Sequence, residues 1–386
     1  MFSLKQPMKP LPVLAANAFA MFVAALLLSR WGSLPWVSVA HLVFAAAILP
    51  LIISAMVYFV PVLTRGREAP RAMQALGLAA WPVGLAAVAG LAWPGGRPWG
   101  PALAAAGMLP LLAIFAGWLR RRVGQTLGQP HPCLAWYVAA LACLLAALVA
   151  VMVMAVWPEQ YAALRRLHLH ANLLGFVGLT ALGTLQVLLP TAAGGPDPQA
   201  GLRLRRHLWP SLAGVALVAL GAAWMPHLAV PGALFLVWPA GVLARVWLLG
   251  RWRTVWVGHG ALPLLAAALA GWLLLLVAGA AAGLGLASGG ALVPVFVQAF
   301  LLPLVTGAVS QLLPVWLRPG AQTPWHGQMR HALGRAGGGR ALLFFAGGLL
   351  AVLGWESAGR VLSGAGLVLT LGVFVRAGWG HRGCGV

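Results

Sequence analysis

The chain has 386 residues, of which 62% are hydrophobic and 8% are charged, and its mean hydropathy is +0.92. Because a helix needs roughly 20 apolar residues to cross the hydrocarbon of a bilayer, this composition predicts an all-α polytopic membrane protein. The net charge of +21 requires no nucleic acid as a partner, since basic residues that face an anionic lipid leaflet account for it.

The chain has few acidic residues, and none of them is predicted to lie in the middle of the membrane. The four of them fall in predicted loops or at predicted helix ends: Glu68, Glu159, Asp197 and Glu356. This placement excludes a mid-membrane carboxylate, the usual group for proton relay or cation coupling.

Apolar windows bounded by Arg, Pro and Gly predict twelve membrane-spanning helices in a single transmembrane domain, 1–386. In chain order they cover residues 11–30, 36–60, 72–93, 100–119, 134–157, 168–189, 208–225, 228–249, 258–285, 290–316, 341–357 and 360–377.

The loop charges predict the orientation of these helices. With a cytoplasmic N-terminus, twenty Lys and Arg residues lie on the inner side and five on the outer side, namely Arg30, Arg97, Arg165, Arg166 and Arg360. The excess of basic residues on one side follows the positive-inside rule. It predicts a multi-pass protein of the bacterial inner membrane with both termini in the cytoplasm.

An internal repeat relates the second, sixth and tenth predicted helices. Three aligned columns carry it: Pro61, Pro190 and Pro314; Ser54, Gly183 and Gly307; His41, His170 and Pro294. The spacing of about four helices predicts three four-helix pseudo-repeats, approximately 1–125, 126–250 and 251–386. We expect the three equivalent helices to lie inside the bundle, around a pseudo-three-fold axis.

Three histidines begin predicted helices on the outer side and are the candidate ligands of a cofactor. Residues two apart on a helix point in nearly opposite directions, so only one of His168 and His170 can face the interior, and the repeat favours His170. Neutral imidazole binds both haem iron and copper, so we expect His41 and His170 to be metal ligands, with His168 as a substitute. The alternative is that these imidazoles face lipid headgroups.

Two further features fit a haem at this depth. Arg165 and Arg166 stand just before the histidines and carry the planar fork that binds carboxylates such as haem propionates, although they could also anchor the helix at the interface. Gln298, one turn below Pro294, could donate a hydrogen bond to an iron-bound ligand, whereas a buried amide can also simply tie helices together. Pro50 and Pro303 should interrupt their helices near the middle.

Twelve helices in three units of four, with outer histidines on the second and sixth helices, resemble subunit I of the haem–copper oxidases. The stretch "HLHANLLGF" at 168–176, with Gly183 and "LLPTAAG" at 188–194, is similar to the membrane motif of the NnrS family. That resemblance implies a haem- and copper-containing membrane protein associated with denitrification and nitric oxide stress.

The sequence departs from both families at positions that matter for a cofactor. Ala171 replaces the glutamate of the NnrS motif. Predicted helix 290–316 lacks the histidines of an oxidase, so the usual binuclear centre cannot be assembled.

The leading hypothesis is therefore a protein that binds haem, of b type, with copper as a further metal, and has a redox or sensing role in nitric oxide or respiratory metabolism. Its partners would be the bilayer, an electron-transfer protein and a gas such as nitric oxide or oxygen. Whether it is an enzyme stays open. One alternative is a copper or small-solute transporter that uses the outer histidines, and another is a structural subunit without a cofactor.

Overall fold

Helix is the regular structure of the part of the chain that the computed structural model describes. That part comprises residues 10–32, 34–93, 95, 99–126, 128–286 and 289–380. Lys5, Lys9, Arg97 and Arg382, which entered the count of loop charges, lie outside it. Within it the secondary structure is helical without strands, as expected where lipid offers no hydrogen bonds to the backbone.

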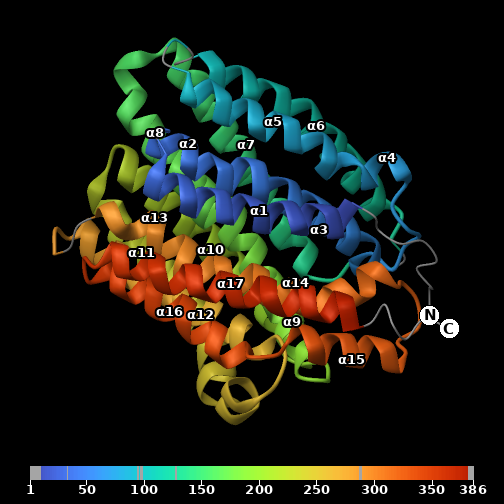
Figure 1. Ribbon diagram of the computed structural model, residues 1–386. Coiled ribbons are helices and arrows are strands. Elements are labelled where there is room, and N and C mark those ends of the chain that lie inside the picture. Colours follow the sequence, from blue (N-terminus) through green and yellow to red (C-terminus); the bar gives the residue numbers. More distant parts are fainter. Residues whose placement is uncertain are drawn as a thin grey trace. The chain divides into compact units, whose positions relative to one another are not determined.

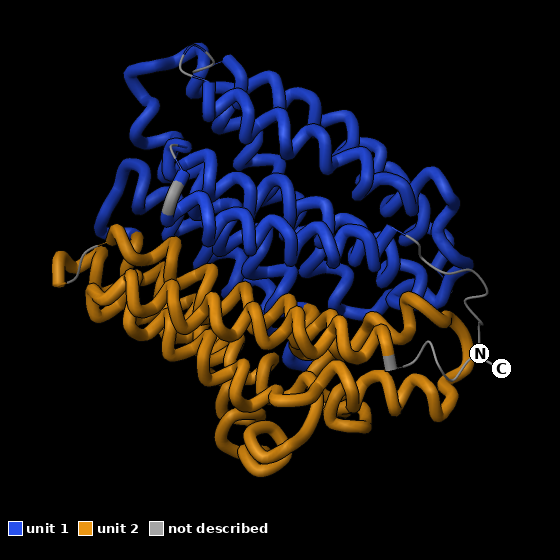
Figure 2. The backbone as a smooth tube through the Cα atoms, viewed as in Figure 1, with its two compact units in different colours: residues 1–183, 201–228 blue, residues 184–200, 229–386 orange. Residues whose placement is uncertain are grey.

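The chain folds into two compact units (Figure 2). Unit 1 comprises residues 1–183 and 201–228, and unit 2 comprises residues 184–200 and 229–386. The division passes through helix α9, inside the second predicted repeat, so the units do not coincide with the repeats.

Unit 1 contains His41, His168 and His170. Its helices are α1 (Pro10–Trp31), α2 (Trp36–His41), the π-helix η1 (Leu42–Ile48), α3 (Leu49–Leu63), α4 (Arg71–Gln74), α5 (Leu76–Ala92), α6 (Trp99–Gly124), α7 (Cys133–Val156), the 3-10 helix η2 (Pro158–Gln160), α8 (Tyr161–His170), the π-helix η3 (Ala171–Leu179), the start of α9 (Thr180–Ala192), α10 (Ala200–Ala223) and η4 (Pro226–Leu228). Figure 1 labels its helices α1 to α8 and α10.

Unit 2 holds the rest of α9 and the C-terminal helices. These are α11 (Ala229–Ala244), the π-helices η5 (Arg245–Leu249) and η6 (Arg253–Val257), α12 (Leu262–Gly283), the 3-10 helix η7 (Gly289–Ala291), α13 (Leu292–Val295), the π-helix η8 (Phe296–Leu301), α14 (Leu302–Leu317), α15 (Pro324–Leu333), α16 (Gly337–Val352) and α17 (Glu356–Gly380).

Ten helical segments of the described chain are long and apolar enough to cross a membrane, so the protein is a multi-pass helical membrane protein. The other two predicted spans correspond to α10 and α16. Helix α10 begins with Arg203, Arg205 and Arg206, and α16 has only 16 residues. The count of twelve stays a prediction.

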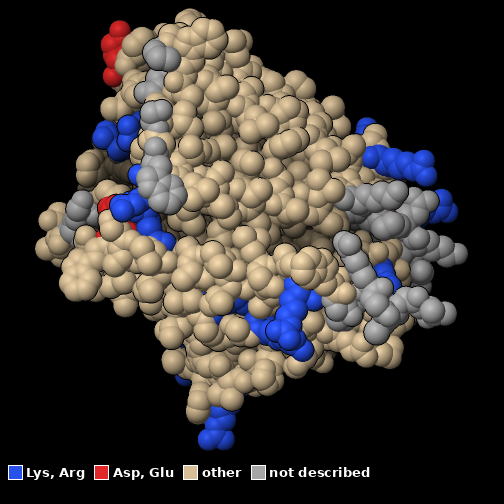
Figure 3. Space-filling view, viewed as in Figure 1, with Lys and Arg blue, Asp and Glu red and all other residues tan. Residues whose placement is uncertain are grey.

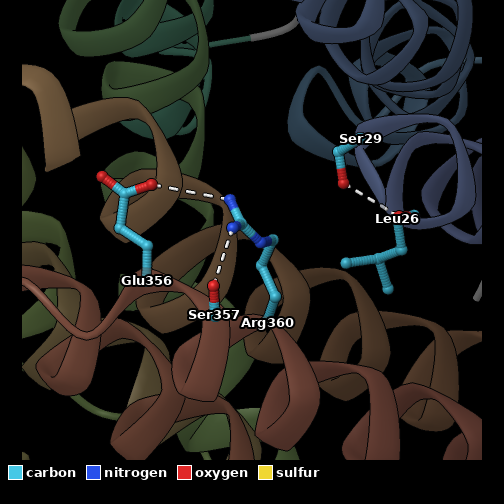
Figure 4. Close-up of polar contacts among 5 residues, drawn as sticks. All are labelled: Leu26, Ser29, Glu356, Ser357 and Arg360. Carbon is cyan, nitrogen blue, oxygen red and sulfur yellow. Dashed lines mark hydrogen bonds and ion pairs between the residues drawn. The ribbon is translucent and has the colours of Figure 1, made fainter. Parts of the chain in front are cut away.

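Charge is sparse on the surface, as the composition requires. The face seen in Figure 3 is mostly neither basic nor acidic, and its charged side chains gather in a few places. At the start of α17 an ion pair joins Arg360 Nη1 to Glu356 Oε2 at 3.5 Å, and Arg360 Nη2 also donates to Ser357 Oγ (Figure 4).

Proline explains two interruptions in the predicted inner helices. Pro50 and Pro303 have no N–H for the carbonyl four residues earlier, and their rings crowd that carbonyl. In both cases a π-helix, η1 or η8, immediately precedes the helix that contains the proline. In unit 1 the carbonyl of Ala46 instead accepts a hydrogen bond from Asn17 Nδ2 at 2.9 Å. The lost backbone bond is thus replaced by a side chain of α1.

A glycine allows the backbones of α12 and η8 to lie in close contact. A Cβ placed on Gly271 of α12 would collide with the carbonyl of Ala299 in η8, whereas Gly279 of the same helix has open space around it. Only a residue without a side chain allows α12 to approach η8 at this point.

We therefore expect Gly271→Ala to destabilise the protein by about 1–3 kcal/mol, the usual cost of overpacking a well-packed site. Gly279→Ala is the matched control and should leave the stability unchanged or slightly raised, because alanine favours helix. Thermal unfolding of both variants in detergent measures the difference. Equal melting temperatures for the two variants would contradict this account of α12 and η8.

Candidate cofactor site

Two histidines from distant parts of the sequence meet in unit 1. His41 is the last residue of α2, and His168 lies in α8. Their ring centroids are 6.2 Å apart and their ring planes differ by 7°. The parallel rings form the candidate site, which we call the histidine pair.

Backbone carbonyls fix the tautomer of both rings. His41 Nδ1–H donates to the carbonyl of Val37 at 2.7 Å, and His168 Nδ1–H donates to the carbonyl of Ala147 at 3.0 Å. A carbonyl can only accept, so the proton sits on Nδ1 and Nε2 keeps its lone pair. This is how a metal-binding histidine is commonly oriented.

The separation of the rings suits a shared metal ion. With metal–nitrogen bonds of about 2.0–2.1 Å and about 1.1 Å from nitrogen to ring centroid, two imidazoles on opposite sides of one ion have centroids roughly 6 Å apart. The observed separation is 6.2 Å, with the two ring planes parallel. The pair could therefore share an ion if both Nε2 atoms turned toward the space between the rings.

Asn172 joins the site from η3, one turn after His168. Its Nδ2 lies 3.3 Å and 3.4 Å from the two ring nitrogens of His168 and donates to the His168 carbonyl at 3.2 Å. Residues four apart share a helix face, so the contact follows from the spacing of His168 and Asn172. Asn172 was not predicted to be a site residue, although this spacing could have indicated it.

The ring that contacts His41 is that of His168, the predicted substitute, and the role of His170 as a ligand stays a prediction. Helix α8 is regular through His170, so the ring of His170 points away from that of His168. Its Nδ1–H donates to the carbonyl of Arg166, four residues earlier, at 2.8 Å. His41 bonds Val37 in the same way. The two residues thus have equivalent local bonds, as a repeat predicts, but equivalent positions need not touch each other.

The two arginines before the pair are exposed on α8. Arg165 lies three residues before His168, and Arg166 lies four residues before His170, so each arginine shares a face with one histidine. Arg166 Nη2 donates to the carbonyl of Ala223 at 3.5 Å. Of the two, Arg165 is therefore the one on the face of the histidine pair.

Gln298 lies in η8 of unit 2, whereas the histidine pair lies in unit 1. Its side chain is buried, its Oε1 has no hydrogen-bond partner, and this oxygen faces Gly359 of α17. A bond from Gln298 to a ligand held by the histidines stays a prediction.

Two histidines outside the pair are buried. His207 and His326 are 4% and 2% exposed. His326 caps α15, because its Nδ1 accepts the N–H of Thr323 and its Nε2–H donates to the carbonyl of Arg318. In the loop before α7, burial lowers the pKa of His131, and the charges of Arg205 and Arg65 lower it further.

Comparison with known proteins identified no relative of this chain. No family model matches the chain, and no curated protein matches its sequence.

Proposed function

We propose that the protein binds haem between His41 and His168 and has a redox or sensing role in nitric oxide, denitrification or respiratory metabolism. The haem would be of b type, held without covalent attachment. Bound haem would supply a one-electron iron couple near the outer surface, and an electron-transfer protein would be its partner. The chain's own contribution is to hold and orient the cofactor.

The number of protein ligands is the observation that carries the proposal. Among the residues that the structure describes, no three His, Cys, Asp or Glu side chains gather at one point. Zinc sites use three or four protein ligands, which the histidine pair does not provide. A porphyrin supplies four ligands itself, so two imidazoles complete the coordination of its iron.

An oxidase-like, three-fold architecture of twelve helices belongs to the same proposal. The three predicted inner helices lie within Trp36–Leu63, Pro158–Ala192 and Gly289–Leu317, whose buried shares of 72%, 89% and 67% are the largest among the ten described spans. Each contains a π-helix, beginning at Leu42, Ala171 or Phe296. In the repeat alignment the first two positions are equivalent, and the third is one residue later.

Contacts within each unit recur at one column of this alignment, formed by Ala46, Gly175 and Ala299. A Cβ on Gly84 of α5 would meet first the Ala45 carbonyl and then Ala46, and a Cβ on Gly348 of α16 would meet Ala299. A Cβ on Gly175 would meet first Cys143 of α7 and then Val215 of α10. The third and eleventh predicted helices thus approach their π-helices near this column, whereas the nearest neighbour at Gly175 belongs to the fifth. These contacts support the repeat at two of its three positions.

Copper supports a second candidate function. Imidazole suits copper as well as haem iron, and two opposed imidazoles can hold one copper ion without a porphyrin. The protein would then be a copper-binding transporter, with the interrupted inner helices as its path. The absorption spectrum and the metal content distinguish the two functions.

We expect the purified protein to show a Soret band. His41→Ala and His168→Ala should each remove one axial ligand, so that the band shifts or haem is lost. His170→Ala is the matched control on the same helix and should keep the wild-type spectrum, because its ring points away from the pair. Absorption spectroscopy and metal analysis of the three variants measure these outcomes.

If the wild type binds copper and shows no Soret band, and the His41 and His168 variants lose this copper, the transporter function would replace the haem-binding function. If only His170→Ala loses the Soret band, the ligands are His41 and His170, the pair that the repeat favoured. If the wild type binds neither haem nor copper, the histidines are interfacial polar groups and the protein is a structural subunit.

We also expect Arg165→Gln to accelerate haem loss about two- to ten-fold, because an exposed charge-assisted hydrogen bond to a propionate is worth a modest amount. Arg166→Gln should have a smaller effect, since Arg166 lies on the face of His170. Transfer of haem to an acceptor protein gives the rates. Unchanged rates in the double variant would make both arginines interfacial anchors.

A further inference from the structure

Unit 2 contains a fully buried arginine. Arg340 lies in the first turns of α16 and has a relative exposure of 0%. It is one of the twenty basic residues that the sequence predicts on the inner side of the membrane. Burial of this kind is rare for arginine unless it is paired.

Most of its hydrogen-bonding groups have no partner. Arg340 Nη2 donates to the carbonyl of Leu333, the last residue of α15, at 2.8 Å. The Nε and Nη1 atoms are buried without an acceptor. These two atoms carry three of the five N–H groups of a guanidinium, so over half of its donors are unsatisfied by the protein.

The charge of Arg340 is also unpaired. Among the described residues no carboxylate forms an ion pair with it, and the chain has only four acidic residues in all. A buried charge without a partner is strongly unfavourable. A negative group from outside the chain would remove this cost.

The surroundings of the guanidinium are suited to an anion. The side chain of a helical residue points toward the N-terminus of its helix, and the bond to Leu333 places the guanidinium at the junction of α15 and α16. The first turn of α16 is Gly337, Gly338 and Gly339. The N–H of Gly337 donates to the carbonyl of Gly334 at 3.1 Å, and the next N–H groups lack acceptors within the helix. The N-terminus of a helix attracts anions.

A buried hydroxyl completes the site. Ser310 of α14 is 1% exposed, and its Oγ lies 3.4 Å from the same Leu333 carbonyl that Arg340 contacts. The serine and the guanidinium therefore meet at one acceptor. The hydroxyl can rotate to donate to an anion, although it also reaches the carbonyl of Thr306 at 2.7 Å.

We propose that Arg340, Ser310 and the glycine-rich start of α16 bind a small inorganic anion such as chloride. The unpartnered N–H groups of Arg340 are its main donors. A free ion fits better than a lipid phosphate, because the guanidinium has no exposed surface for a headgroup to approach.

Thermal unfolding in detergent, with gluconate replaced stepwise by bromide, tests the proposal. The melting temperature of the wild type should rise and saturate. Arg340→Met should remove the saturable rise and be more stable than the wild type in gluconate alone, because it lacks the uncompensated charge. Arg340→Lys keeps a cation and should bind bromide at least ten-fold more weakly. Arg335→Gln, an exposed arginine of the same junction, is the control and should behave like the wild type.

Three results would overturn the proposal. A wild type without saturable bromide dependence, with Arg340→Met less stable at every concentration, would make Arg340 a helix cap satisfied by water. A saturable rise that persists in both Arg340 variants would place the anion elsewhere. If native mass spectrometry shows that Arg340→Met loses a bound phospholipid and not bromide, the ligand is a lipid phosphate.

Discussion

The structure depends on one constraint, which is that backbone polar groups in the hydrocarbon must find partners within the protein. The inner helices break the regular pattern at three π-helices, η1, η3 and η8, and π-helical turns often occur at functional sites. Where Pro50 provides no N–H, Asn17 provides one for Ala46. Where Pro303 provides none, Gly271 lets α12 approach the carbonyl of Ala299. A side-chain amide, Asn17, and a small residue, Gly271, therefore lie next to the interruptions in η1 and η8.

The same constraint explains the histidine pair. A half-buried imidazole must satisfy its N–H, and His41, His168 and His170 all do so through Nδ1 and a backbone carbonyl. His41 and His170 bond carbonyls of their own helices, whereas His168 bonds Ala147 of the neighbouring α7. The bond between helices fixes the position of His168 relative to α7, and it leaves Nε2 as the basic nitrogen. The polar requirement of the fold thus places the lone pair of each ring on Nε2.

Much of this fold follows from the sequence, because apolar length and loop charge act locally. Ten of the twelve predicted spans correspond to described helical segments long and apolar enough to cross a membrane, and the interruptions at Pro50 and Pro303 follow from proline chemistry. The partner of His41 could not be predicted in this way. The alignment equates His41 with His170, but contact depends on which faces of α2 and α8 meet, and that is decided by packing between segments far apart in sequence. The burial of Arg340 could not be predicted for the same reason, because the sequence does not distinguish an arginine exposed in a loop from a buried one.

The coordination of the proposed haem limits what the protein can do. If the histidine pair holds the proposed haem, His41 and His168 would both be its protein ligands, an arrangement that would suit electron transfer. Access of a gas such as nitric oxide or oxygen would then depend on whether either histidine can move. His168 is tied to Ala147 and contacts Asn172, whereas His41 is tied only to its own short helix α2. His41 is therefore the ring that can move without breaking a bond between helices. A fixed pair would suit the proposed electron transfer, whereas movement of His41 would suit the proposed sensing role.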